Sequence, residues 1–258
     1  MPLSIRLHGL GGPEVLAYDE VPAPVPGPGE VRLAVRAIGV NRAEVMYRQG
    51  SYFSRPPLPA QLGYEASGEI DALGPGVEGF AVGDHVSVVP AFGFSEYGPY
   101  GQQVLAPARA VVRNPEGQSW EQAAASWMQY ATAWSGLIDA AGLAEGDAVL
   151  LPAASSSIGL AATAVGGIIV AYGALSQETT PLPMLALLGR GQTIRGFGLT
   201  GAMRRDDKLA AAKAFVGRGL SSGALTPKIA RIFPFGQMAE AHRYMEANTH
   251  IGKIVVTV

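Results

Sequence analysis

The sequence predicts an α/β protein in which a β-rich part is followed by a segment of alternating strands and helices. Runs of β-branched and alternating apolar residues, separated by Gly- and Pro-rich turns, fill about the first 115 residues. After Asp147 the pattern changes to short apolar runs that alternate with helical stretches, as in a parallel sheet covered by helices. Hydrophobic residues make up 48% of the chain and charged residues only 16%, so we expect a globular chain that buries much of its surface.

The β-rich part contains seven expected strands and two expected helix starts. The strands are expected at residues 4–10, 15–21, 30–40, 66–73, 85–89, 102–106 and 111–113. Asn41 and Glu44 have the spacing of a capping box, and Gly50 is a typical helix stop, so a short helix is predicted between them. Ser119 and Gln122 have the same spacing and predict a longer helix that runs to about Ala141.

The second part predicts a βαβαβ order. Its strands are expected at residues 147–151, 168–172 and 193–199, with helices at 160–165 and 183–188. The remaining chain predicts helices at residues 206–216 and 238–247 and strands at 228–233 and 253–258.

Composition excludes several classes of function. The net charge is −2 and the basic residues are scattered, so no nucleic-acid surface is expected. The chain has no Cys, hence no disulfide, no thiolate nucleophile and no cysteine-ligated zinc, and its four His are dispersed, so we expect no metal site. Residues 148–177 carry no charge, but Pro152 and a Ser triplet interrupt them, which favours buried strands over a membrane span. The first residues show no export signal, so the cytoplasm is the expected location.

The stretch Ala153–Gly159 is a candidate nucleotide-binding turn. It follows an expected strand and precedes an expected helix, and its small residues would let backbone N–H groups approach a pyrophosphate at the helix N-terminus. The same small residues would also simply allow tight packing of the strand on the helix. Both readings stay open from the residues alone.

Several motifs occur in an order that resembles a known family. They are residues 41–52 (NRAEVMYRQGSY), 63–68 (GYEASG), 74–76 with 82–86 (VGDHV), Thr132-Ala133, 146–159 (GDAVLLPAASSSIG) and 252–256 (GKIVV). Together they resemble the zinc-independent quinone oxidoreductase branch of the medium-chain dehydrogenase/reductase superfamily. The resemblance implies a GroES-like β-rich catalytic domain built from residues 1–126 and 200–258, and a Rossmann cofactor domain over residues 127–199. It also implies reduction of a small apolar quinone or enone by NADPH.

The cofactor domain departs from that family in length. Residues 147–199 number only 53, whereas a six-stranded Rossmann sheet needs about 130–150 residues. The central strands, including the one that would hold the adenosine ribose, are missing, so NADP(H) binding is expected to be weak. Glu178 lies 19 residues after Gly159, at the distance of a ribose-binding acid, but the surrounding sequence resembles a later strand, which favours a solvated loop acid.

The resemblance assigns roles to a small set of residues. Asn41 and Tyr52 are the expected catalytic residues, and Glu65 is expected to be a buried polar brace. The expected cofactor-binding residues are Asn41, Thr132, Ser155, Ser156, Ser157, Ile158, Gly159, Gly173, Leu175 and Ser176. Two copies are expected to pair through the strand from Thr193 to Leu199. The alternative is a non-enzymatic scaffold that dimerises or binds an apolar ligand without productive NADP(H) binding.

Overall fold

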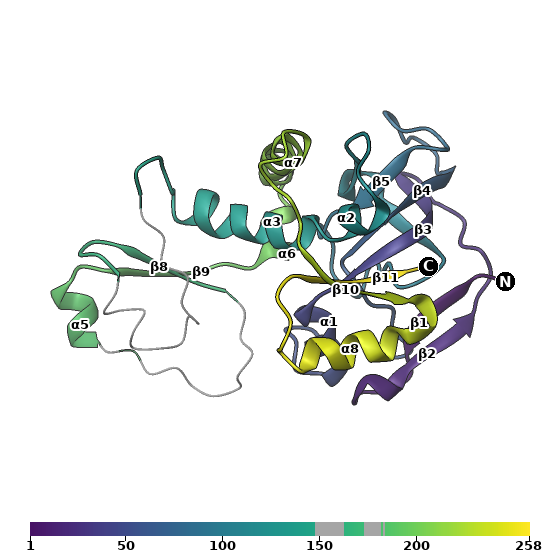
Figure 1. Cartoon of the computed structure of the whole chain (residues 1–258), viewed down its shortest axis with the longest axis horizontal. Helices are drawn as coiled ribbons and strands as arrows, with labels where there is room; N and C mark the ends of the chain where they lie inside the picture. Colours follow the sequence, from purple (N-terminus) through teal and green to yellow (C-terminus); the bar gives the residue numbers. More distant parts are fainter. Residues whose placement is uncertain (148–162, 173–181, 183) are drawn as a thin grey trace.

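A computed structural model describes residues 1–147, 163–172, 182 and 184–258, and it shows the predicted mixed α/β architecture (Figure 1). Its main feature is a seven-stranded sheet in the order β10-β11-β3-β4-β5-β7, with β6 beside β11 on one edge of β3. The strands are β3 (Glu30–Val40), β4 (Glu65–Leu73), β5 (His85–Val88), β6 (Gln103–Pro107), β7 (Val111–Arg113), β10 (Ile229–Pro234) and β11 (Lys253–Thr257).

Strand β3 organises this sheet because it is long and pairs along both edges. Its side chains alternate between buried and less buried positions over its first half, as expected for a strand that covers a core with one face. The last strand, β11, pairs antiparallel with the end of β3, from Ile254 opposite Val40 to Thr257 opposite Ala37. The C-terminal strand therefore pairs into the N-terminal β-rich part, as predicted, whereas the domain division at residues 126 and 200 stays a prediction.

A separate hairpin lies beside this sheet. Strands β1 (Leu3–Leu7) and β2 (Leu16–Glu20) pair antiparallel, and β1 also bridges to Ala60 and Gly101. The second strand begins later than expected because η1 (Pro13–Val15) forms a 3-10 turn before it. A second 3-10 turn, η2 (Ala108–Ala110), separates β6 from β7.

Helix α1 (Arg42–Gln49) begins after Asn41, as predicted, but not by the predicted mechanism. Asn41 has the backbone of an N-cap residue, yet its side chain makes no capping hydrogen bond. Buried partners described below engage that amide instead. Gly50 ends the helix with φ 75°, a left-handed conformation that glycine adopts without steric cost.

The predicted continuous helix from Ser119 to Ala141 is wrong, although its capping box is present. The chain forms α2 (Trp120–Ala124), α3 (Trp127–Ala133) and a π-helix, η3 (Trp134–Ala140). Glu65 explains the first break, because one of its carboxylate oxygens accepts a 2.8 Å hydrogen bond from the backbone N–H of Met128 in the first turn of α3. A carboxylate at a helix N-terminus satisfies a free amide and is favoured by the helix dipole.

The described part of the cofactor region is a single βαβ unit. Strands β8 (Ile168–Ala171) and β9 (Thr193–Gly196) pair in parallel and are joined through α5 (Met184–Gly189). In Figure 1 this unit extends away from the large sheet. Strand β9 is shorter than expected because α6 (Leu199–Met203) already begins at residue 199. Most of the strand, turn and helix expected at residues 147–165 lies outside the described residues.

Two longer helices follow in the C-terminal part of the chain. They are α7 (Asp206–Ser221), which packs against α3 and η3, and α8 (Met238–Glu246), which follows the 3-10 turn η4 (Phe235–Gln237) and packs against β10 and β11. Within the described ranges, no helix is both long enough and apolar enough to cross a membrane.

Candidate active site

A buried polar network joins β3, α1, β4, β11 and α3. The Lys253 ammonium donates to the amide oxygen of Asn41 and to the carboxylate of Glu65, with which it forms an ion pair. The Lys253 side chain is 8% exposed and that of Glu65 is 1% exposed. Burying an ion pair costs desolvation energy unless further hydrogen bonds satisfy both groups, and here Asn41 and the Met128 amide supply them. The expectation that Glu65 is a buried polar brace is confirmed.

Glu44 is the second carboxyl group of this network. Its side chain is fully buried, and one oxygen accepts a 3.2 Å hydrogen bond from the amide nitrogen of Asn41. Its other oxygen has no hydrogen-bond partner among the described residues. Burial raises the pKa of Glu44 to about 8, although the nearby charge of Lys253 opposes that shift. Glu44 is therefore mostly a neutral acid at pH 7, which leaves Lys253 paired with a single carboxylate.

Gly39 is required for the close packing of this network. A Cβ atom at residue 39 would lie 2.1 Å from the carbonyl oxygen of Ala124 and 2.6 Å from the Glu65 carboxylate. Both contacts are shorter than any side chain allows, so glycine lets α2 and Glu65 approach β3. Glu65 can therefore reach the first turn of α3, the helix that carries Thr132.

An aromatic cluster lies beside the buried network. The ring of Phe94 stacks on Tyr47 at 4.3 Å and lies 3.9 Å from Tyr64, and Tyr52 meets it edge-on at 5.3 Å. The hydroxyl groups of Tyr52 and Tyr64 are hydrogen-bonded at 3.2 Å. Burial raises the pKa of Tyr64 well above its usual range, and the hydrogen bond with Tyr52 adds to that shift. The Tyr64 phenol therefore keeps its proton at neutral pH, in a largely aromatic setting.

The structure connects three of the predicted site residues. Asn41 is buried, with 8% of its surface exposed, and is linked through Lys253 and Glu65 to the first turn of α3. Thr132 lies on α3, partly buried, and its hydroxyl donates to the carbonyl oxygen of Met128 at 2.6 Å. Tyr52 follows α1, and its ring meets that of Tyr47 on α1.

The remaining predicted cofactor residues lie outside the described part of the chain. They are Ser155, Ser156, Ser157, Ile158, Gly159, Gly173, Leu175 and Ser176, together with the rejected ribose candidate Glu178. Their roles remain predictions. Sequence reasoning gave no site role to Lys253, Tyr64 and Phe94, and it gave Glu44 only a capping role. Three of these residues carried a signal: Lys253 lies in the quoted 252–256 motif, Tyr64 lies in the 63–68 motif, and Glu44 has the capping-box spacing from Asn41.

Of the two described residues expected to contact the cofactor, only Thr132 has a group available to a nicotinamide. Thr132 uses its hydroxyl hydrogen within α3, so its oxygen lone pairs remain free to accept from a carboxamide N–H. Asn41 is less available, because both its amide nitrogen and its amide oxygen already have protein partners. Within the described ranges, no group of three or more His, Asp or Glu side chains is placed to hold a metal ion. The Lys253 ammonium lies between the oxygen atoms of Asn41 and Glu65.

Comparison with known proteins supports the fold. The family model "Alcohol dehydrogenase GroES-like domain" matches residues 27–138, and "Zinc-binding dehydrogenase" matches residues 131–256. The synaptic vesicle membrane protein VAT-1 homolog of Rattus norvegicus is 39% identical over 158 residues, which is 60% of this chain and 38% of that protein. The chain thus spans less than two thirds of the length of the curated relatives it matches.

Solved structures share the fold over nearly the whole chain. An NAD-dependent alcohol dehydrogenase is 26% identical with a TM-score of 0.84, and the match covers 99% of each chain. A quinone oxidoreductase of Pseudomonas syringae pv. tomato is 22% identical with a TM-score of 0.84, and the match covers 100% of each chain. The GroES-like sheet and the two successive family matches, which together span residues 27–256, show that the chain belongs to the medium-chain dehydrogenase/reductase superfamily.

Proposed function

We propose that this chain is a zinc-independent reductase that uses NADPH to reduce a small apolar quinone or an enone with an activated C=C bond. The observation that carries the proposal is the hydrogen-bonded Tyr52–Tyr64 pair in an aromatic cluster beside the Asn41 network. Flat aromatic walls favour a flat apolar substrate, and a phenol provides a proton donor next to it.

Hydride transfer requires little acid–base catalysis by the protein. Bound NADPH would supply a hydride, that is, two electrons and one proton, to the substrate. The second proton must reach the reduced oxygen or carbon from the protein or from water, and we assign that role to the Tyr52 hydroxyl. Tyr64 supports it by holding the Tyr52 hydroxyl at 3.2 Å, and because Tyr52 is only partly buried, water returns the lost proton to it.

The buried network has a positioning role in this proposal. Lys253 and Glu44 fix the two ends of the Asn41 amide, and Glu65 fixes the first turn of the helix that carries Thr132. Asn41 and Thr132 are thereby held on one rigid unit at the nicotinamide end of the cofactor. Preorganisation of this kind is the main contribution a protein makes to hydride transfer.

The experiment is an absorbance assay of NADPH oxidation with a naphthoquinone as the substrate. We expect turnover above the rate without protein, and Tyr52→Phe should reduce that turnover by about 10²-fold or more. Tyr97→Phe is the matched control, since the Tyr97 hydroxyl donates to Glu30 outside the aromatic cluster. Equal loss in both variants would show that Tyr52 has no special role. Absence of any turnover at millimolar NADPH would favour the alternative, a scaffold that dimerises or holds an apolar ligand without reducing it.

We also propose a homodimer through the outer edge of β9. Among the described strands, β9 pairs only with β8, so its second edge offers free backbone donors and acceptors. The available strand is Thr193–Gly196 rather than the full stretch to Leu199. Sedimentation should give a dimer mass at micromolar concentration, and Ile194→Pro should convert it to a monomer. A monomer of the unaltered chain would refute this pairing.

A further inference from the structure

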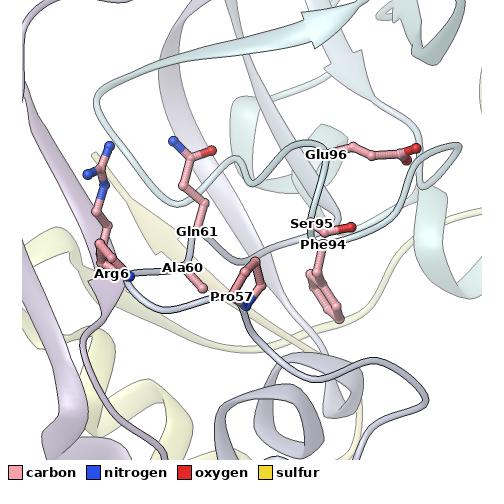
Figure 2. Close-up of a pocket in the computed structure, with 8 residues that line it drawn as sticks. Arg6, Pro57, Ala60, Gln61, Phe94, Ser95 and Glu96 are labelled. Atoms are coloured by element: carbon pink, nitrogen blue, oxygen red, sulfur yellow. The ribbon is translucent and has the colours of Figure 1, made fainter.

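A small pocket lies behind the aromatic cluster, between β1 and two loops. It has a volume of about 220 Å³ and is lined by Arg6, Pro57, Pro59, Ala60, Gln61, Phe94, Ser95 and Glu96. Figure 2 shows that the side chains of Arg6 and Gln61 extend in the same direction, across from the loop that carries Ser95 and Glu96. Its lining is mixed: Phe94, Ala60 and two prolines are apolar, whereas Arg6, Gln61, Ser95 and Glu96 are polar.

Arg6 is a cation without a partner in this pocket. Its side chain is partly buried on β1, and its Nε atom is buried without a hydrogen-bond partner in the described part of the chain. Two other arginines of the β-rich part have carboxylate partners. Arg32 bonds Asp71 at 2.7 Å and Arg48 bonds Glu246 at 2.8 Å. An anionic ligand gains the most binding free energy at a partly desolvated guanidinium that has no anionic partner in the protein.

The carboxylate in the pocket lining, that of Glu96, does not pair with Arg6. Glu96 bonds Arg204 at 2.7 Å and accepts a 2.6 Å hydrogen bond from the backbone N–H of Gly93. In Figure 2 its side chain points away from Arg6. Gln61 and Ser95 make no side-chain hydrogen bond to another described residue, so an amide and a hydroxyl remain free in the lining.

A neighbouring hollow fits an anion less well. It has a volume of about 600 Å³ and shares Arg6, Gln61 and Glu96 with the small pocket, but it also contains Glu30. The Glu30 carboxylate accepts from the Gly27 amide and from the Tyr97 hydroxyl and has no cationic partner among the described residues. Its negative charge would oppose an anion there, so the smaller pocket is the better site.

We propose that the small pocket binds a monocyclic aromatic carboxylate, with the carboxylate on the Arg6 guanidinium and the ring on the apolar side chains of Phe94, Pro57 and Ala60. The planar guanidinium matches a carboxylate with two parallel hydrogen bonds. Because Phe94 also contacts Tyr47, Tyr52 and Tyr64, such a ligand would touch the back of the aromatic cluster. The inference does not depend on the proposed reductase activity.

The test is a titration of the full chain with benzoate in a low-salt buffer, followed by calorimetry and by ligand-observed NMR. We expect saturable binding that Arg6→Gln weakens by about 10- to 100-fold, the effect of losing a charge-assisted hydrogen bond. Gln61→Glu should weaken it at least as much, because the new carboxylate would pair with Arg6, and residue 61 is exposed, so folding is preserved. Benzamide, the neutral analogue, should bind the unaltered chain as weakly as benzoate binds Arg6→Gln.

Arg55→Gln is the matched control. It removes the same charge from an exposed residue that lies just before Pro57 in the sequence and outside the pocket lining. The affinity for benzoate should remain unchanged. Thermal unfolding of every variant checks that it is folded. The proposal is overturned if benzoate shows no saturable binding, if Arg6→Gln binds it as well as the unaltered chain does, or if Arg55→Gln weakens it equally.

Discussion

The large sheet and the βαβ unit differ in how well each buries its own apolar residues. In the large sheet, Leu33, Ile38, Val86 and many neighbours are fully buried. In the βαβ unit no described apolar residue is fully buried, and Leu185 and Leu188 of α5 are 89% and 70% exposed. Two parallel strands and one short helix cannot enclose a core, because a stable sheet needs more strands or a covering layer. The β-rich part is complete by this measure, and the described cofactor region is not.

The largest expected consequence is weak cofactor binding. The short cofactor region is predicted to lack the strand that would hold the adenosine ribose and its 2′-phosphate, and losing two charge-assisted contacts costs about 3–6 kcal/mol. This corresponds to about two to four decades in Kd, so a micromolar cofactor would become a millimolar one. Turnover should rise almost linearly with NADPH, and NADH should serve nearly as well. A fluorescence titration checks this, and saturation at low micromolar NADPH with clear preference over NADH would show a working cofactor domain.

The buried ion pair should matter far more than an exposed one on the same sheet. Lys253→Met leaves the Glu65 carboxylate buried without its cation and should lower the free energy of unfolding by about 3–5 kcal/mol. Arg36→Met is the matched control, because the Arg36–Glu69 pair is exposed and 3.9 Å apart, and it should cost less than about 1 kcal/mol. Urea unfolding measures both values. Similar losses in the two variants would mean that the network does not support the fold.

The sequence predicted this fold well where patterns are local. Apolar alternation located β3 and β11, and the Ser119–Gln122 spacing correctly predicted a capping box. The prediction failed where a contact with a residue far away in the sequence determines the local structure. The helix after Ser119 breaks because Glu65, far away in the sequence, accepts from the Met128 amide. Asn41 has the same cap spacing as Ser119, yet Lys253, more than 200 residues later, engages its side chain. A local sequence pattern shows neither contact, so the sequence predicted only some of the residues of the candidate site.

The contrast in burial can be tested with one type of substitution in both regions. Leu33→Ala removes a fully buried side chain from the large sheet and should cost about 2–5 kcal/mol of unfolding free energy. Leu185→Ala removes a side chain that is 89% exposed on α5 and should change stability by less than about 0.5 kcal/mol. Both values come from chemical unfolding followed by circular dichroism. A large loss in Leu185→Ala would show that α5 is covered, for instance by a second copy, and would remove the contrast.

The smallest expected effect concerns the buried acid of the network. Burial raises the pKa of Glu44 from 4.5 to about 8 in the folded chain, whereas the unfolded chain ionises it near the ordinary value. Between these two pH values the folded state holds a proton that the unfolded state has released. The stability contributed by protonated Glu44 is therefore complete below pH 4.5, falls as the pH rises toward 8, and falls no further above it.

Glu44→Gln isolates this effect, because glutamine keeps the shape of the protonated acid and can still accept from Asn41. The stability of the variant relative to the unaltered chain should increase by about 1–3 kcal/mol between pH 5 and pH 8. Glu78→Gln, at an exposed position, is the matched control and should show no such trend. The midpoints of urea unfolding, measured for each variant between pH 5 and pH 8, test this prediction. Parallel pH profiles for Glu44→Gln and the unaltered chain would mean that Glu44 is ionised in the folded state, so that two carboxylates would share the single ammonium of Lys253.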